Sequence, residues 1–184
     1  MGIMAGIFYA VITYWQWRDL RRNFEVGQRA WVLVERAPII TDGTVNEPDI
    51  TKIPSAPLVI NTPQSILVAF KNSGMSPALK IHVRVNGAIS ASSKGCSLIA
   101  LPPDSIDSTS VLGPGHVAWS TGLKIIVRPD CFDAINRGAA IVKMTGIIDY
   151  EDIFNHGHTT DFCLQYDAPK ALGMADCKEG NDAN

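Results

Sequence analysis

Residues 79–85 alternate strictly between apolar and polar side chains. The apolar positions are Leu79, Ile81, Val83 and Val85, and the positions between them are Lys80, His82 and Arg84. A period of two residues predicts a β-strand with one buried and one solvated face, because successive strand side chains point to opposite sides. This segment therefore favours a sheet whose apolar face covers a core and whose polar face is exposed to solvent.

A turn precedes this strand. The sequence Lys-Asn-Ser-Gly-Met-Ser-Pro at residues 71–77 separates it from a second apolar run at residues 65–70. Asn72 and Gly74 are residue types that tolerate a positive φ. The two strands and their connection therefore predict either a hairpin or a tight corner between two sheets.

Short apolar runs separated by turn residues continue along the chain, which contains 15 glycines and 11 prolines. Further strands are predicted at residues 30–35, 58–61, 122–127, 139–150 and 158–166. The Pro-, Ser- and Gly-rich segments 37–57 and 90–114 are predicted to be loops. A helical turn is predicted at residues 130–136, with Asp130 as its N-cap and Gly138 as its stop. This pattern predicts a mainly β, immunoglobulin-like antiparallel β-sandwich.

Residues 1–17 contain no charged side chain. The aromatic residues at the end of this segment are Tyr14, Trp15 and Trp17, and the arginines that follow are Arg18, Arg21 and Arg22. As a helix the segment would span about 25 Å, against about 30 Å for the hydrocarbon core of a bilayer. The aromatic cluster and the arginines predict a single-pass transmembrane helix with its amino terminus outside and the β domain in the cytoplasm. The alternative is an N-terminal core helix or strand.

These patterns divide the chain into four parts. Residues 1–17 form the predicted transmembrane helix, and residues 18–28 a charged linker that could continue the helix. Residues 29–168 form the β-sandwich, and residues 169–184 a polar tail whose last residues, 175–184, are expected to be frayed.

Charge and motifs limit the possible functions. The chain has 16 basic and 18 acidic residues, a formal net charge of −2, so no basic excess is present to neutralise nucleic-acid phosphates. The sequence lacks the Gly-x-Ser-x-Gly elbow and the glycine-rich loops that bind phosphates or dinucleotides. We therefore expect no nucleic-acid partner, no cofactor, no catalytic residues and no enzymatic activity.

Polar side chains are densest in residues 146–166, which are predicted to form a hairpin. A three-residue loop of Asn155, His156 and Gly157, with Gly157 in the left-handed conformation, would place apolar residues opposite one another, Tyr150 facing Phe162. On the other face Asp149 would lie opposite Cys163, and Glu151 opposite Asp161.

Two interpretations of that face stay open. Asp149, Glu151 and Asp161 are weak candidates for a site that binds a hard cation. Alternatively, their carboxylates diverge into water. Asp152 falls on the apolar face, where it would bond Thr160 or a loop amide.

The four cysteines are Cys96, Cys131, Cys163 and Cys177. Their spacing is irregular, and a domain of this size does not need disulfides for its stability. In a cytoplasmic domain we expect all four to be free thiols.

Three segments together resemble a known group of proteins. They are Arg-Ala-Trp-Val at residues 29–32, the corner with Asn72, Gly74 and Pro77, and a hairpin with Tyr150, Asp152, Phe154, His158, Thr160, Phe162 and Cys163. With the N-terminal helix, this order resembles uncharacterised proteobacterial proteins that are anchored in the membrane. The resemblance implies a bacterial inner-membrane protein with a small β domain and no established activity.

The expected function is a membrane-anchored, non-catalytic binding or scaffolding module whose partners are the lipid bilayer and an unidentified protein. One alternative is a sensor or enzyme that uses Asp149, Glu151 and Asp161 with a divalent cation. A second alternative is an accessory subunit of a larger membrane complex, in which the Gly2 and Gly6 pair permits close helix packing.

Overall fold

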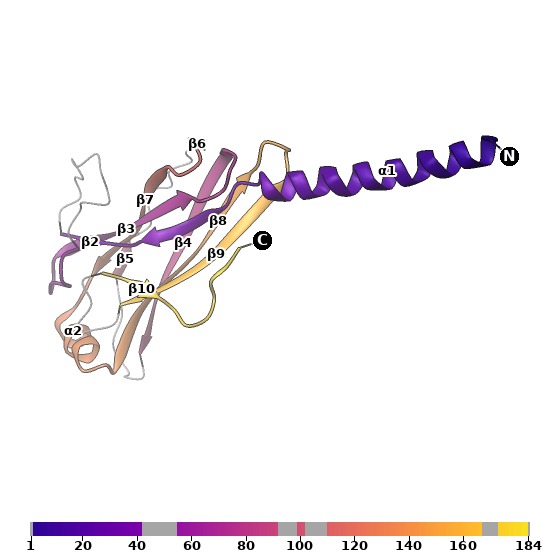
Figure 1. Ribbon diagram of the computed structural model, residues 1–184. Coiled ribbons are helices and arrows are strands. Elements are labelled where there is room, and N and C mark those ends of the chain that lie inside the picture. The colour runs from indigo at the N-terminus through magenta and orange to yellow at the C-terminus, as the bar shows by residue number, and fades with distance from the viewer. Residues whose placement is uncertain (1, 42–54, 92–98, 102–109, 167–172, 184) are drawn as a thin grey trace.

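One long helix and two antiparallel sheets make up the computed structural model, which describes residues 2–41, 55–91, 99–101, 110–166 and 173–183 (Figure 1). The helix α1 spans Gly2–Gly27, and a short helix, α2, spans Pro129–Asn136. The mainly β, antiparallel fold that the sequence predicts is confirmed.

The first sheet has the strand order β1-β3-β7-β5, with β2 beside β3. Its strands are β1 (Val32–Arg36), β2 (Ile39–Ile40), β3 (Pro63–Asn72), β5 (Ile99–Leu101) and β7 (Val117–Ile126). The second sheet has the order β10-β9-β8-β4-β6, with β11 also beside β9. Its strands are β4 (Ala78–Ala91), β6 (Ser110–Leu112), β8 (Ala140–Glu151), β9 (Gly157–Tyr166), β10 (Ala175–Asp176) and β11 (Asp182–Ala183).

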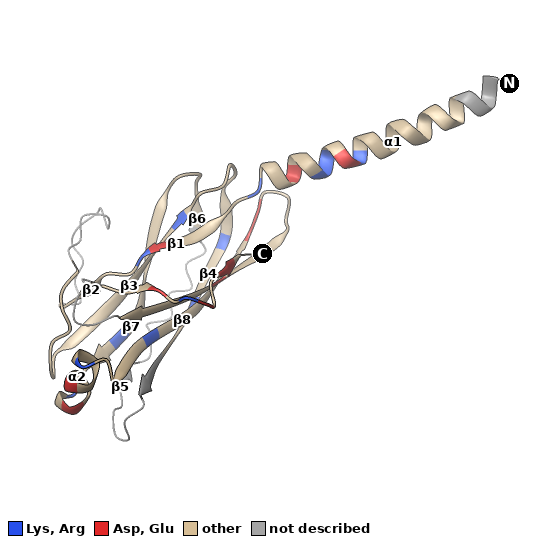
Figure 2. Cartoon of the chain, turned by 60° about the horizontal axis from the view of Figure 1, so that its bottom comes forward, with Lys and Arg blue, Asp and Glu red and all other residues tan. Residues whose placement is uncertain are grey.

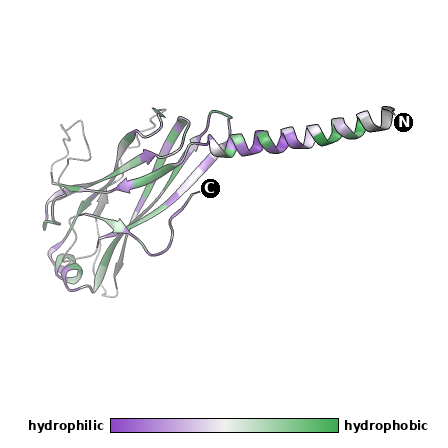
Figure 3. Ribbon diagram, in the orientation of Figure 1, coloured by the Kyte–Doolittle hydropathy of each residue, from purple (hydrophilic) through white to green (hydrophobic). Residues whose placement is uncertain are grey.

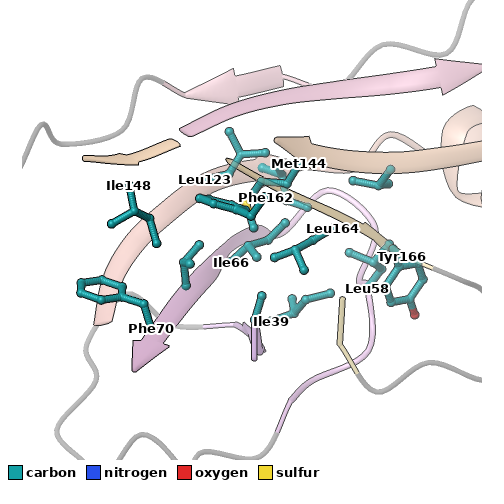
Figure 4. Close-up of a cluster of buried hydrophobic side chains, with 14 of the residues drawn as sticks. Ile39, Leu58, Ile66, Phe70, Leu123, Met144, Ile148, Phe162, Leu164 and Tyr166 are labelled. Carbon is teal, nitrogen blue, oxygen red and sulfur yellow. The ribbon is translucent and has the colours of Figure 1, made fainter. Parts of the chain in front are cut away.

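Both sheets contribute to one hydrophobic core (Figure 4). Ile66 and Phe70 come from β3 in the first sheet, whereas Met144 and Ile148 come from β8 in the second. Along β8 every second side chain is buried, because the period of two residues turns alternate positions toward the core. Strand β3 of the first sheet differs, because nearly all of its side chains are buried on both faces.

The corner between β3 and β4 joins the two sheets, so the second of the two predicted alternatives is correct. Neither Asn72 nor Gly74, however, adopts the positive φ that its residue type tolerates. The non-glycine residues with positive φ are Asn61, Lys80 and Asn155, and Gly74 is not among the glycines with positive φ. Asn72 and Gly74 serve this corner in another way, through side-chain hydrogen bonds and close packing.

Three local predictions need correction. No strand forms at residues 58–61, where Ile60 makes only an isolated bridge to Val127. The segments predicted as loops contain the short strands β2, β5 and β6, and the rest of them lies mostly outside the described residues. Helix α2 has Arg128 rather than Asp130 as its N-cap, because Pro129 takes the first helical position, where no N–H is needed.

Helix α1 extends away from the β domain (Figure 1). Its charged residues lie in the half nearer the domain, and the half toward the amino terminus is more apolar (Figures 2 and 3). The predicted linker, residues 18–28, continues this helix as far as Gly27. In the part of the chain that the structure describes, no helix combines the length and apolar character required to cross a membrane.

Residues 175–183 are not frayed, which corrects the prediction for this part of the tail, and Asn184 lies outside the described residues. We call residues 174–183 the strap. Its strands β10 and β11 both pair with β9, and its Cys177 forms a disulfide with Cys163.

The expectation of free thiols is wrong for every described cysteine. Cys131 is also disulfide-bonded, in addition to the Cys163–Cys177 pair. Cys96 lies outside the described residues. Irregular spacing misled the prediction because strand pairing, which spacing does not report, brings Cys177 beside Cys163.

Candidate functional site

The three landmark segments of the sequence meet where α1 enters the β domain. Residues 29–32 lead from the helix into β1, which pairs with β3 through Val32 and Asn72. The corner after β3 and the β8–β9 hairpin both contact this entry segment through hydrogen bonds. We call this region the junction, and its buried polar side chains include Asn72, Asp152 and Thr160.

Asn72 is fully buried, and its side-chain amide makes four hydrogen bonds. Its Oδ1 accepts from the backbone N–H of Trp31 at 3.2 Å and of Gly74 at 3.0 Å. Its Nδ2 donates to the carbonyls of Ser76 at 2.7 Å and Leu112 at 2.9 Å. Both donors and both lone pairs of the amide are thus used. Asn72 therefore ties the entry segment, its own corner and β6 to one point.

Gly74 lies against the backbone of the entry segment. A Cβ at this position would collide with the carbonyl oxygen of Arg29, the N–H of Trp31 and the Cα of Ala30. Only a residue without a side chain permits this approach. Gly74 is therefore required for close packing, and Pro77, three residues later, is half-buried immediately before β4.

Tyr150 and Thr160 hold the first residues of β1 from the other sheet. Val32 N–H donates to the Tyr150 hydroxyl at 3.4 Å, and that hydroxyl donates to the Ala30 carbonyl, also at 3.4 Å. The Thr160 hydroxyl donates to the Val32 carbonyl at 2.6 Å. Both side chains are buried, so these bonds join the two sheets where β1 begins.

Asp152 organises the loop between β8 and β9. Its Oδ1 accepts from the backbone N–H of Phe154 at 2.8 Å and of His156 at 3.0 Å, and its Oδ2 contacts His158 Nε2 at 2.8 Å. The loop-amide alternative predicted for Asp152 is thereby confirmed, while Thr160 bonds elsewhere. Asp152 is 1% exposed.

Two opposing effects act on the pKa of Asp152. Burial raises it, because desolvation disfavours the charged carboxylate. The hydrogen bonds from the His158 side chain and from the His156 and Phe154 N–H groups lower it, as does the charge of His158. The lowering effects prevail, and the pKa lies below its usual value of 3.8. The carboxylate is therefore a stable acceptor that fixes the loop.

Aromatic rings link this loop to the helix. Phe154 packs edge-on against Phe24 of α1, with ring centroids 6.4 Å apart. The Arg29 guanidinium lies 4.1 Å from the centroid of Trp31, and its Nε and Nη2 are buried with no hydrogen-bond partner among the described residues. The last turn of α1 thus rests on the hairpin loop.

The predicted hairpin register is wrong, although the predicted faces are correct. Tyr150 pairs with His158 instead of Phe162, because the loop consists of residues 152–156 and is centred two residues earlier than the predicted loop of residues 155–157. Asn155, with φ of 62°, takes the left-handed position that was assigned to Gly157. Phe162 pairs with a glycine of β8 and belongs to the core.

The three carboxylates proposed as cation ligands do not share a site. Asp149 forms an ion pair with Arg84 at 2.5 Å, and Glu151 forms one with Lys80 at 2.7 Å. Asp161 lies opposite Ile147 across the β8–β9 ladder instead of opposite Glu151. Among the described residues, no group of three His, Cys, Asp or Glu side chains is arranged to hold a metal ion.

Asp161 instead faces the strap. It pairs with Asp182 of β11 and lines a hollow of about 250 Å³ between β1, β9 and the strap. Leu33, Val34 and Phe162 also line this hollow. This surface was not predicted, because the strap has no strand periodicity and its pairing with β9 depends on contacts distant in the sequence.

Comparisons of the chain with protein-family models, with curated proteins and with solved structures find no significant match. The resemblance to membrane-anchored proteobacterial proteins therefore stays a prediction. The geometry of the junction, of α1 and of the strap is the basis for a functional proposal.

Proposed function

We propose that this protein is a membrane-tethered, non-catalytic binding or scaffolding module, with α1 as the tether and the β domain as the binding part. The observation that carries the proposal is the exposed apolar surface of α1. Its large exposed apolar residues before the first arginine are Ile7, Phe8, Tyr9, Val11, Ile12, Tyr14, Trp15 and Trp17.

These side chains surround the helix axis instead of forming one stripe. Successive residues of a helix are rotated by about 100°, so positions 7, 8, 9 and 11 already point to different sides. A helix that is apolar on all sides is buried in protein or in lipid. We therefore propose that the apolar half of α1 enters the hydrocarbon of a bilayer.

The residues that follow suit the lipid headgroups. The Arg18 guanidinium lies 4.2 Å from the ring centroid of Trp15, and that of Arg21 lies 5.7 Å from the ring centroid of Trp17. Tryptophan and arginine are favoured at membrane interfaces, where an apolar body meets a polar surface. This girdle would hold the charged half of α1 and the β domain outside the hydrocarbon.

A binding role suits the β domain because three buried polar residues of the junction are already used by its structure. Asn72, Asp152 and Thr160 are used in hydrogen bonds that hold the junction together. The two antiparallel sheets around one core support an immunoglobulin-like sandwich, which is part of this proposal. Such domains commonly serve as recognition modules, an argument from fold-level analogy.

The compartment is also a proposal, and two features favour different ones. Arginines after the apolar segment favour a cytoplasmic β domain. The disulfide between Cys163 and Cys177 favours an oxidising compartment, because cytosolic thiols are kept reduced. We place the β domain on the oxidising side, since the arginines can equally contact headgroups there. The bacterial inner membrane stays a prediction from the resemblance.

Flotation of the full chain with phospholipid vesicles tests the tether. Ile7 and Val26 are matched positions, because each side chain is 57% exposed on α1. An aspartate in the hydrocarbon costs about 3 kcal/mol, so Ile7→Asp should lower vesicle binding about a hundredfold. Val26→Asp, next to the β domain, should leave binding nearly unchanged. A wild-type chain that does not float, or equal losses in both variants, would contradict the proposal.

The alternatives have less support. A cation-dependent sensor would need Asp149, Glu151 and Asp161 together, whereas two of them are ion-paired and the third faces the strap. Calorimetric titration of the full chain with Ca²⁺, Mg²⁺, Mn²⁺ and Zn²⁺ that yields binding heat would revive it. A subunit packed through α1 would lose its partner helices on Gly6→Leu, which should leave vesicle flotation intact.

A further inference from the structure

The outer edge of β9 is covered by the strap, and the cover is incomplete. Near one end of β9 the residues of β10 pair with Gln165 and Leu164, and nearer the hairpin loop the residues of β11 pair with Asp161 and Thr160. Two residues contribute to each pairing, so the strap forms two short ladders rather than one continuous strand.

Between the two ladders the strap still provides hydrogen-bond partners for the backbone of β9, but one of these partners is a side chain. The Cys163 carbonyl accepts from the Cys177 N–H at 2.9 Å. The Cys163 N–H, however, donates to the side-chain Oδ1 of Asn181 at 2.8 Å, while Asn181 Nδ2 donates to the Cys177 carbonyl at 3.2 Å. A side-chain amide thus stands where a continuous partner strand would offer a backbone carbonyl.

Charge also weakens the cover. Asp182 lies directly opposite Asp161, and like charges in such a pair are destabilising. Asp176 lines the same hollow. Most side chains of the strap are exposed, so little apolar burial opposes this repulsion. The Cys163–Cys177 disulfide, in contrast, fixes the strap covalently at its centre.

The hollow beside the β9 edge could accommodate a side chain of a continuous strand that pairs with β9 more completely than the strap does. Leu33, Val34 and Phe162 line it on the domain side, and Asp161 stands at its rim. A continuous strand added to β9 could satisfy the Cys163 N–H with a backbone carbonyl, place an apolar side chain in the hollow and bring a basic side chain opposite Asp161. Backbone pairing gives affinity in such strand addition, and alternate side chains give specificity.

We propose that the β9 edge is the site where this module binds an extended peptide segment of a partner protein, with an apolar side chain and a basic side chain opposite Asp161. The strap is the resting occupant, and the disulfide locks it. This inference rests on the proposed binding role but not on the tether.

Opening requires a dithiol reductant. One thiolate of the dithiol attacks a sulfur of the Cys163–Cys177 bond and forms a mixed disulfide, and the other thiolate resolves it. The S–S bond of the protein breaks, Cys163 and Cys177 each take up a proton as thiols, and the dithiol is oxidised to its own disulfide by loss of two electrons. The freed strap then competes with the partner segment as a weak, untethered strand.

The test uses the full chain in detergent micelles and two synthetic probes. The lysine peptide is an alternating Thr-Val peptide with one central Lys, and the aspartate peptide has Asp at the same place. Fluorescence anisotropy measures their binding to the oxidised wild type, to Cys177→Ser and to the exposed neighbour control Lys178→Ser. Cys177→Ser should bind the lysine peptide at least about tenfold more tightly than the other two proteins, and more tightly than it binds the aspartate peptide.

Charge reversal at the exposed Asp161 provides the decisive second variant. Asp161→Lys combined with Cys177→Ser should reverse the preference and favour the aspartate peptide. Equal lysine-peptide binding by oxidised wild type and Cys177→Ser, or no binding to either, would overturn the proposal. Dimers of Cys177→Ser without peptide, detected by sedimentation, would assign the edge to a second copy and also overturn it. Flotation of Cys177→Ser with vesicles reports on the tether separately.

Discussion

Two asparagines, Asn72 at the junction and Asn181 in the strap, play similar structural parts in very different surroundings. Asn72 and Asn181 both use a side-chain amide in place of a backbone partner. Asn72 makes four hydrogen bonds and is 0% exposed, whereas Asn181 makes two and is exposed. The difference teaches that the same side-chain substitution for a backbone partner is buried and fully bonded at the junction but exposed and only partly bonded in the strap, which supports the proposal that the strap can be released.

The asparagines should therefore differ strongly in their contribution to stability. Asn72→Ala leaves several buried donors and acceptors without partners and should lower the free energy of unfolding by about 4 kcal/mol. Asn181→Ala exposes its partners to water and should lower it by less than about 1 kcal/mol. Urea unfolding of the full chain in micelles measures both. Similar losses in the two variants would remove the contrast.

Removal of the disulfide should have the next largest effect. Cys163 and Cys177 are separated by 14 positions, and a loop of that size gives about 3 kcal/mol in the chain-entropy description. Cys177→Ser should lower the free energy of unfolding by up to that amount, with Lys178→Ser as the neutral control. In Cys177→Ser the Cys163 amide should lose protection against hydrogen exchange, whereas the Trp31 amide should keep its protection. Equal loss of protection at both would mean that strap and junction open together.

Replacing the loop carboxylate of Asp152 should lower the free energy of unfolding by a smaller amount, and that amount should depend on pH. Asp152→Asn weakens charge-assisted hydrogen bonds and should cost about 2 kcal/mol at neutral pH. The pKa of Asp152 is lowered in the folded protein, so its contribution is fully present above the unfolded value of 3.8. It is lost as the pH falls below 3.8 through the folded pKa, because the unfolded chain takes up the proton first. The difference in the free energy of unfolding between wild type and Asp152→Asn, measured by urea unfolding, should narrow over that pH range. A difference that stays constant with pH would contradict the lowered pKa of Asp152.

Relief of repulsion in the strap should give the smallest change. Asp182→Asn removes one of the two facing carboxylates and should raise the free energy of unfolding by about 0.5 kcal/mol. The Cys163 amide should exchange more slowly in this variant. A destabilised strap would show that Asp182 has an attractive partner and would weaken the argument for a releasable cover.

The features of this structure that depend on neighbouring residues in the sequence are predicted well. Alternation at residues 79–85 identifies the strand, whose apolar residues are buried or half-buried, and the pattern at residues 139–150 identifies the next one with its buried face. The turn residues identify the corner after β3. Asp152 was expected to bond a loop amide, and it does. These features depend on neighbours in the sequence, which is the information that periodicity and turn chemistry contain.

The features that depend on contacts between residues distant in the sequence were not predictable in the same way. The roles of Asn72 and Gly74 depend on residues 29–31, which lie far away in the sequence. The predicted hairpin register was wrong because the loop occupies residues 152–156 rather than 155–157, which moves its centre by two residues and separates Glu151 from Asp161. The strap has few apolar residues and is positioned by pairing with β9 and by a disulfide, neither of which leaves a periodic pattern.

The depth of α1 in a bilayer is the most direct test of the account. The four tryptophans are Trp15, Trp17, Trp31 and Trp119, so replacing Trp31 and Trp119 by Phe leaves the pair on α1 as the only source of tryptophan fluorescence. With vesicles present, these two should be quenched by lipids brominated near the headgroup end of the acyl chain and protected from aqueous iodide. Full quenching by iodide, with no quenching by brominated lipid, would show that α1 stays in water and would contradict the proposed tether.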